Sequence, residues 1–167
     1  MGKASGVSGQ DRQKLIWDLA FEEARLAAVR GETPVGAVVM REGKVLASAG
    51  NRTLELKDPT AHAEVLAIRR ACQEAGSERL PGADLYVTLE PCTLCAGAIS
   101  FARIRRLYYA ASDPKGGAVD SGVRFFNQPS CHHAPEAYGG FREAESAELL
   151  KGFFQDRRKG PGAAGQD

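Results

Sequence analysis

Two short motifs bring together side chains that can bind a metal and move protons. The first is His-Ala-Glu at positions 62–64, and the second is Pro-Cys-Thr-Leu-Cys at positions 91–95. One imidazole and two thiolates would leave the fourth position of a tetrahedral zinc ion open, which is typical of a catalytic zinc site. The predicted zinc ligands are therefore His62, Cys92 and Cys95.

Glu64 is predicted to move protons and not to bind the metal. Residues two apart on a helix point about 200° away from each other, so Glu64 cannot share one helical stripe with His62. In the first turn of a helix both side chains can still flank a metal that lies over the helix end. Helix N-termini also stabilise thiolates and hydroxide through their free N–H groups.

Each motif by itself is weak evidence. H-x-E occurs by chance, and C-x-x-C could be a thioredoxin-like redox pair. In this chain, however, Pro91 precedes the first cysteine and does not separate the two. Because both motifs also follow strand-to-helix patterns, they jointly favour a metal site.

The elements that must position these motifs follow from periodicity and turn residues. The sequence predicts helices over about 11–29, 60–76, 92–102 and 142–158, with Thr60 as an N-cap, and strands over 35–40, 45–49, 85–89 and 107–109. This order predicts an α/β fold, a three-layer α/β/α sandwich with a mixed central sheet.

The pattern also predicts which helix faces are buried. The first helix should bury Leu15, Leu19, Leu26 and Val29, and the last should bury Ala147, Leu150 and Phe154. The helix over 92–102 is apolar nearly all round and is predicted to be buried.

Length and composition fit one globular domain. The chain has 167 residues, of which 43% are hydrophobic and 26% are charged. Residues 11–159 are the predicted domain, between disordered ends at 1–10 and 160–167. No apolar run approaches a membrane span, so the expected location is cytoplasmic. The net charge of +1 says nothing about nucleic acid.

H-A-E followed by P-C-x-x-C is similar to the signature of the cytidine-deaminase-like superfamily. Over about residues 11–158 the chain resembles, more closely, the bacterial tRNA-specific adenosine deaminases, in segments 34–38, 50–52, 58–64, 88–92 and Asp113-x-Lys115-x-Gly117. The family usually has Met where this chain has Leu94, which is expected to be a buried exchange of little consequence.

The resemblance implies zinc as the cofactor, a sheet of about five strands with the fifth near 134–138, and a homodimer. It also implies conversion of the wobble adenosine of a tRNA anticodon to inosine. Asn51 and Val35 would line the adenine pocket, and Asp113 and Lys115 would contact the anticodon loop. No DNA substrate and no membrane partner are expected.

The implied reaction is hydrolytic. Zinc would lower the pKa of a bound water, and Glu64 would take its proton and protonate the ring nitrogen. The same carboxyl would finally pass a further proton to the departing ammonia. Two other readings stay open: a deaminase of a free base or nucleoside such as guanine or cytosine, and a zinc-stabilised RNA-binding module without turnover.

Several residues have a second interpretation. Gly36 is expected to let the backbone approach the site closely, and Asn51 could also be a turn residue that ends the hairpin. Arg157 and Arg158 could bind phosphate or complement the helix dipole. The segment 131–133, Cys-His-His, could bind a second metal, but an ordinary loop is the favoured prediction.

Overall fold

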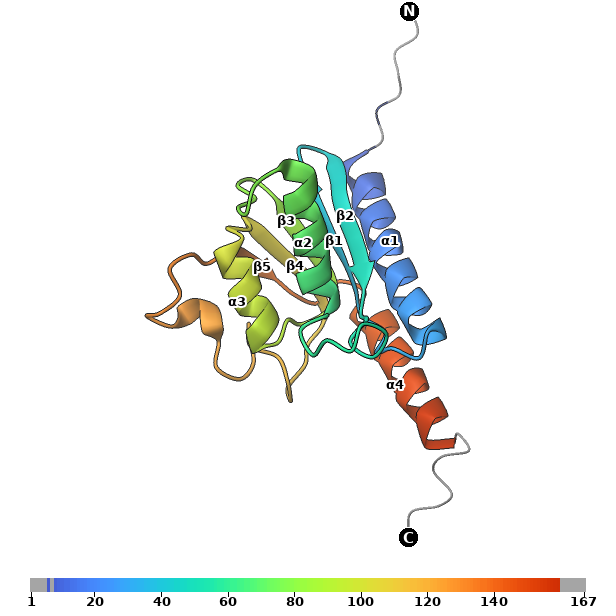
Figure 1. Ribbon diagram of the computed structural model, residues 1–167. Helices are drawn as coiled ribbons and strands as arrows, with labels where there is room; N and C mark the ends of the chain where they lie inside the picture. Colours follow the sequence, from blue (N-terminus) through green and yellow to red (C-terminus); the bar gives the residue numbers. More distant parts are fainter. Residues whose placement is uncertain (1–5, 7, 160–167) are drawn as a thin grey trace, which may run out of the picture.

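The computed structural model describes residue 6 and residues 8–159, and these form a five-stranded sheet between two pairs of helices (Figure 1). The elements are α1 (Gly9–Val29), β1 (Gly36–Arg41), β2 (Lys44–Gly50), α2 (Ala63–Ala75), β3 (Asp84–Leu89), α3 (Thr93–Phe101), β4 (Arg106–Ala111), the short 3-10 helix η1 (Phe125–Asn127), β5 (Glu136–Tyr138) and α4 (Glu143–Lys159). Ser8 caps α1, which therefore begins two residues before the predicted start. The other predicted disordered residues, 1–5, 7 and 160–167, lie outside the described residues.

The sheet has the strand order β2-β1-β3-β4-β5. Strand β1 runs antiparallel to β2 and β3, whereas β3, β4 and β5 are parallel. This mixed sheet confirms the predicted three-layer α/β/α class and the fifth strand. Pro135 directly precedes β5 at the sheet edge, where its missing N–H costs no ladder hydrogen bond.

Alternating side chains of β1 divide the core into two layers. Val38 packs with Trp17 and Phe21 of α1, while Ala37 and Val39 face the opposite side with residues of α2 and α3. Figure 1 shows α2 and α3 side by side over one face of the sheet, with α1 and α4 on the other side. The turns that lead into α2 and α3 consequently lie at the same edge of the sheet.

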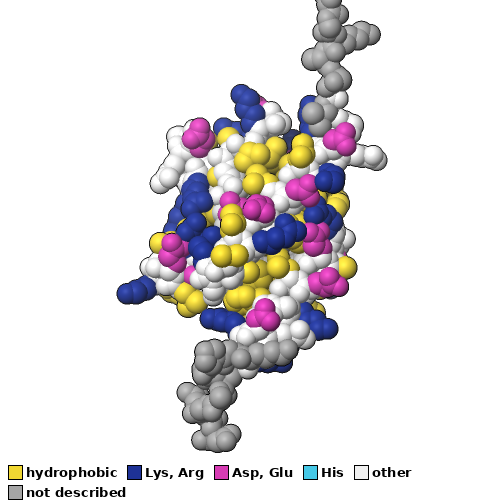
Figure 2. Space-filling view, turned by 90° about the vertical axis from the view of Figure 1, so that its right-hand side faces the viewer, with side chains coloured by type: hydrophobic (Ala, Val, Ile, Leu, Met, Phe, Trp, Pro, Cys, Tyr) yellow, Lys and Arg dark blue, Asp and Glu magenta, His cyan; other side chains and the backbone are white. Residues whose placement is uncertain are grey.

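The predicted buried face of α1 is wrong for three of its four residues. Leu15, Leu26 and Val29 are exposed, Val29 to 84%, while Leu19 is partly buried against the core. The face against the sheet is instead built from Trp17, Ala20, Phe21, Ala24 and Ala27. Figure 2, which views this side of the molecule, shows hydrophobic side chains among acidic and basic ones.

A close approach between backbones explains the choice of face. A Cβ added to Gly36 would lie 1.9 Å from the carbonyl oxygen of Ala20, so only small residues fit where β1 meets α1. The alanine face of α1 packs there because leucines would hold the helix too far from the strand. Gly36 therefore serves contact with α1 and not, as predicted, close approach to the site.

The burial predicted for α3 and α4 also needs correction. Ala147 and Phe154 of α4 are exposed, and Leu150 is only partly buried. The buried residue is Ser146, whose hydroxyl donates a hydrogen bond to the carbonyl oxygen of Thr88 at 2.5 Å. A polar side chain can take this core position because its hydroxyl is hydrogen-bonded to a strand carbonyl.

One side of α3 faces outward. Leu94 is 42% exposed and Phe101 is 77% exposed, so the helix is not buried all round and Leu94 is not a core residue. In the part of the chain that the structure describes, no helix is long and apolar enough to cross a bilayer.

Candidate active site

Two helix N-termini converge at the edge of the sheet. His62 is the N-cap residue of α2 and Cys92 is the N-cap residue of α3, and neither side chain caps its own helix. Thr60 is not the N-cap, because its N–H and hydroxyl both donate to the Asp58 carboxylate and the helix begins only at Ala63. The first N–H groups of both helices are thus available to favour negative charge between them.

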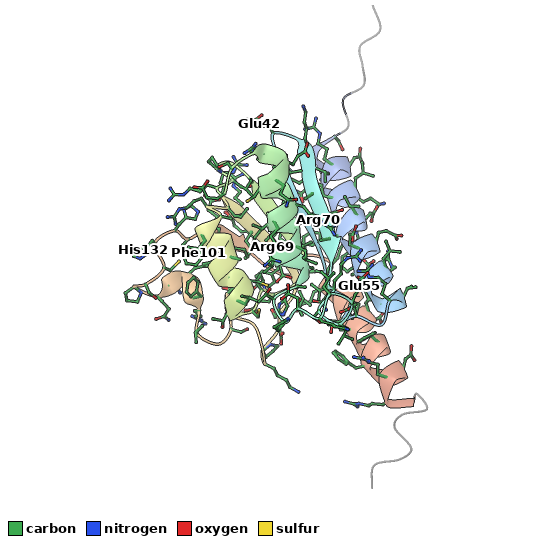
Figure 3. All side chains as sticks on the ribbon, in the orientation of Figure 1. Glu42, Glu55, Arg69, Arg70, Phe101 and His132 are labelled. Carbon is green, nitrogen blue, oxygen red and sulfur yellow. The ribbon has the colours of Figure 1, made fainter. Side chains whose placement is uncertain are left out.

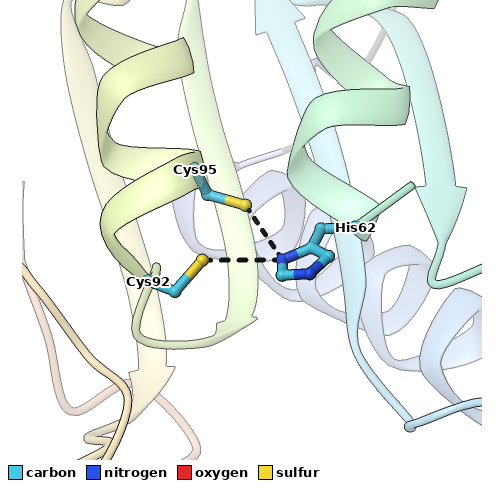
Figure 4. Close-up of side chains that lie close together, drawn as sticks. All are labelled: His62, Cys92 and Cys95. Carbon is cyan, nitrogen blue, oxygen red and sulfur yellow. Dashed lines mark hydrogen bonds between the residues drawn. The ribbon is translucent and has the colours of Figure 1, made fainter. Parts of the chain in front are cut away.

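The three predicted zinc ligands meet in this space. Cys92 Sγ lies 3.5 Å and Cys95 Sγ lies 3.4 Å from His62 Nδ1, with both thiols directed at the imidazole ring (Figure 4). In a tetrahedral zinc site, a sulfur and a nitrogen ligand are about 3.6 Å apart. The ligand atoms therefore already have the spacing that zinc requires, and they are the one such group found among the described residues.

The two thiols cannot easily ionise together without a cation. A hydrogen bond from the Cys95 thiol outweighs the cost of burial and, with the neighbouring His62, lowers the pKa of Cys92 to about 4. The same hydrogen bond and burial raise the pKa of Cys95. A doubly charged metal ion would allow both sulfurs to be thiolates, so the chemistry of this donor set fits zinc.

Glu64 lies in the first turn of α2, next to this group but outside it. Its side chain is only 4% exposed, and burial raises the pKa of the carboxyl. A carboxyl of this kind can both accept and return a proton at neutral pH.

A pocket of about 230 Å³ opens over His62, Cys92 and Glu64. It is lined by Thr33, Val35, Asn51, Thr53, His62, Glu64, Leu89, Glu90, Cys92, Asp113 and Gly116. Val35 and Asn51 thus line the pocket, as the resemblance implied. Asp113, for which the resemblance implied contact with the anticodon loop, lines it as well, whereas Cys95 and Lys115 are not among the lining residues. Pockets for drug-sized ligands measure about 300–1,000 Å³, so this one suits a single base.

Lys115 and Asp113 belong to the loop after β4. The Asp113 carboxylate accepts hydrogen bonds from the N–H groups of Lys115 and Gly116, which makes it a turn residue as well as a pocket residue. Lys115 is exposed and, among the described residues, has no ion-pair partner.

Glu90 was missed as a functional residue by the sequence analysis. It is 2% exposed, and its carboxylate accepts hydrogen bonds from the N–H groups of Asp113, Val119, Asp120 and Ser121. Burial opposes its ionisation, but these hydrogen bonds prevail and lower the pKa of Glu90. The loop from 113 to 121 is therefore folded around one carboxylate next to Cys92.

Glu32 is a second missed residue. It is 1% exposed and lies directly behind the pocket wall, where it contacts Asn51. Both residues share one feature in the sequence. Each acid lies in a segment with few other charged residues, Glu32 directly before Thr-Pro and Glu90 directly before Pro-Cys. A buried carboxylate needs several donors, and those donors come from loops that sequence spacing does not connect.

The remaining polar candidates have structural partners. His133 Nε2 is 2.8 Å from the carbonyl oxygen of Ile104, and Cys131 Sγ is 3.1 Å from the carbonyl oxygen of His133. The segment 131–133 therefore contributes to loop structure, and no second metal group appears among the described residues. Arg157 lies over the ring of Phe153, with 5.1 Å between the guanidinium carbon and the ring centroid.

Comparison with known proteins places the chain in a deaminase family. The sequence model of the MafB19-like deaminase family matches residues 11–158. A tRNA-specific adenosine deaminase of Agrobacterium fabrum is 67% identical over 141 residues, which are 84% of this chain and 93% of that protein.

Solved structures give the same result for the fold. A structure from a study of A-to-I editing by tRNA:A34 deaminases at the wobble position matches with a TM-score of 0.81 and 66% identity, over 82% of this chain and 99% of that one. A guanine deaminase from Nitrosomonas europaea matches with a TM-score of 0.68 and 20% identity, over 89% and 85% of the two chains. That second likeness concerns the fold alone.

Proposed function

Since this chain belongs to the family of tRNA-specific adenosine deaminases, we propose that it hydrolyses the wobble adenosine of a tRNA anticodon to inosine. The observation that carries the proposal is a base-sized pocket in which buried Glu64 lies beside the His62, Cys92 and Cys95 group. The proposed catalytic domain is residues 11–159.

The proposed cofactor is zinc, held by His62 Nδ1 and the sulfurs of Cys92 and Cys95. When bound, zinc acts as a Lewis acid that makes a water molecule acidic enough to lose its proton near neutral pH. The burial of Cys95 keeps competing water away from its sulfur, and the two helix N-termini favour the charged form of both sulfurs.

Glu64 carries out the proton transfers. Its carboxylate takes a proton from the water that adds to C6 of adenine, and it gives that proton to N1 of the ring. It then takes the proton of the newly added hydroxyl and passes it to the amino group, which leaves as ammonia as the C6 carbonyl forms. Adenosine and water are thereby converted to inosine and ammonia.

Asn51 and Val35 hold the base. Both are 8% exposed and line the pocket, so an amide and an apolar surface are presented to a flat, polar-edged ring. An Asn side chain can pair with adenine through both its donor and its acceptor. Their task is to fix C6 in front of the nucleophile, which lowers the entropic part of the barrier.

The remainder of the substrate lies outside the pocket. A cavity of this size holds one base, and every lining residue falls between 33 and 116, so α4 does not contribute to the lining. An anticodon loop offers a base that is already partly unstacked, and extruding that base costs less than from a duplex. Exposed Lys115 and the partly buried Asp113, which belong to the same loop, are proposed to contact the neighbouring nucleotides.

We also propose a homodimer that uses the outer side of α3. Phe101 is 77% exposed and Leu94 is 42% exposed on this helix, and Figure 3 shows Phe101 on its outer side. Beside Phe101 a hollow of about 440 Å³ lies between α2 and α3. A second copy on this face would cover an exposed aromatic ring at the C-terminal end of the helix whose N-cap residue is Cys92. With tRNA as its substrate, the proposed location is the cytoplasm.

The test compares kcat/KM for an anticodon stem-loop, free adenosine and guanine at two ionic strengths. The stem-loop should be preferred by at least about 100-fold, because contacts outside the pocket are used to position C6. Lys115→Ala should weaken stem-loop binding and reduce its salt slope by about one, while Asn51→Ala should slow the chemical step. If kcat/KM for free adenosine or guanine equalled that for the stem-loop, or if the value for the stem-loop did not change with salt concentration, the tRNA assignment would be refuted in favour of a free-base deaminase.

A further inference from the structure

Glu32 stands just outside the pocket and is held there by the end of α1. Gly31 has φ 82° and the N–H of Glu32 donates to the carbonyl oxygen of Ala27 at 2.9 Å, which closes the helix in a Schellman motif. The chain then turns inward, and the Glu32 side chain is 1% exposed. It is absent from the residues that line the pocket, so it cannot touch the base directly.

The carboxylate of Glu32 is surrounded by donors from the segment after β2. It accepts hydrogen bonds from the N–H of Leu54 at 3.0 Å and the N–H of Glu55 at 2.8 Å, and from the side-chain amide of Asn51 at 3.2 Å. Figure 3 shows Glu55 on the loop that leads toward α2. Among the described residues Glu32 has no ion-pair partner, so neutral donors alone compensate its buried charge.

A carboxylate only accepts hydrogen bonds, and this fixes the orientation of Asn51. The amide group of Asn51 that faces Glu32 must be its nitrogen, because the oxygen would be repelled. The nitrogen also donates to the Thr53 hydroxyl oxygen at 3.4 Å. The amide therefore cannot flip, and its carbonyl oxygen remains for the base. The main chain of Asn51 is held as well, since its carbonyl oxygen accepts a hydrogen bond from Arg30 at 3.3 Å.

We infer that Glu32 is a positioning residue that sets the orientation of Asn51 and thereby the placement of the adenine base. This inference rests on the proposed function. The inference adds to the proposed function a residue, Glu32, that lies 19 positions before Asn51 and has no contact with the substrate.

The inference is tested with Glu32→Gln, which keeps the size of the side chain. Gln must place its NH₂ group against either the Asn51 amide or the loop N–H groups, so one donor faces another in either orientation. Measured on the anticodon stem-loop, kcat should fall about 10- to 100-fold, as for other residues that orient a group at a site, with little change in KM. The zinc content and the melting temperature are measured alongside.

A double-mutant cycle separates positioning from general destabilisation. In the Asn51→Ala background, Glu32→Gln should have less than about a twofold further effect, because the residue through which it acts is already gone. Glu23→Gln is the matched control. Glu23 is a partly buried acid on α1 that accepts a hydrogen bond from Ser48 at 3.1 Å. Neither residue lines the pocket, and Glu23→Gln should leave kcat unchanged.

The outcomes are distinct. Additive losses in the two backgrounds, a loss confined to KM, or an unchanged kcat in Glu32→Gln would overturn the inference while leaving adenosine deamination by the wild type intact. If Glu32→Gln does not fold, the same cycle is run with Glu32→Asp, which keeps the charge but cannot reach both Asn51 and the loop. A wild-type protein that is inactive on the stem-loop would instead refute the proposed function.

Discussion

At the scale of single residues, Cys95 is the most deeply buried of the three predicted zinc ligands. It is fully buried at 0% exposure, and its sulfur is 3.4 Å from His62 Nδ1. We expect Cys95→Ser to lose bound zinc, to lose activity and to melt at a lower temperature, because the ion joins the two helix N-termini. Metal analysis, activity and thermal unfolding are the measurements.

The control for this prediction is Cys131→Ser, which changes a cysteine outside the metal group. A serine there can still bond to the carbonyl oxygen of His133, so zinc content should be unchanged. Full zinc occupancy in Cys95→Ser would show that the ion is held by other groups.

Glu64 allows a separate prediction at the same scale. Glu64→Gln should keep its zinc and its fold, because the side chain lies outside the metal group, and it should lose about 10²- to 10⁴-fold in kcat. Single-turnover rates at saturating stem-loop, with metal analysis of the same sample, measure both properties. Zinc loss in this variant would make Glu64 a ligand, and retained turnover would mean that another group moves the protons.

At the scale of elements, Glu90 determines whether the loop after β4 is formed. A Cβ on Gly117 would lie 2.4 Å from the Glu90 carboxyl carbon, so the loop is wrapped tightly around this side chain. We expect Glu90→Gln to loosen residues 113–121, because an amide cannot accept all the N–H groups that the carboxylate accepts. Hydrogen exchange should rise in this loop, and KM for the stem-loop should rise with it. Unchanged exchange there would contradict the assignment.

The contact between α1 and α4 gives a prediction about pH. Hydrogen bonds from Lys14 and Arg142 lower the pKa of Asp18 below its ordinary value of 3.8. Since the folded state favours the ionised form, the resulting stability is complete above the ordinary pKa and is lost as the pH falls through the lowered value. Asp18 is 40% exposed, so the contribution is at most about 1 kcal/mol and should shrink with salt.

Thermal unfolding of the wild type and Asp18→Asn across this range measures the effect. The difference in melting temperature should be present near neutral pH and vanish in acid. Asp156→Asn, at an exposed acid of α4 with no ion-pair partner among the described residues, should show no such difference at any pH. A difference for Asp18→Asn that persists in acid would mean that the charge is not its cause.

At the scale of the whole molecule, the exposed side of α3 predicts the state of assembly. Phe101→Glu should convert the proposed dimer to a monomer, because it places a charge on the most exposed aromatic ring of this face. Sedimentation measures the mass, and Val29→Glu is the control, since Val29 is 84% exposed on α1 at the other side of the sheet. A monomeric wild type, or a dimeric Phe101→Glu, would place the interface elsewhere or remove it.

Features that depend on local interactions could be predicted from the sequence, and features that depend on contacts between distant residues could not. The strands and helices were predicted within a few residues because periodicity and turn residues act locally, as with Gly76, which ends α2 at φ 68°. The predicted ligands converge in the structure because β2 and β3, which lie on either side of antiparallel β1, run in the same direction and end at the same edge of the sheet. Their role in binding zinc stays a prediction.

The predictions that failed concerned which surfaces touch. Leucines of α1 were expected in the core, but the close approach of Gly36 to Ala20 selects the alanine face. Ser146 replaces apolar residues of α4 in the core because it satisfies the carbonyl oxygen of Thr88, which lies 58 positions earlier. No local pattern carries such information.

The sequence by itself determined the order of elements, the α/β class and the chemical types at the site, because these follow from residue identity and short spacing. Only the tertiary structure decided that Glu32 is buried behind the pocket wall and Glu90 within it, each accepting hydrogen bonds from the N–H groups of a distant loop. The physical reason is that a buried carboxylate is defined by its donors, and those donors come together only when the sheet has been assembled.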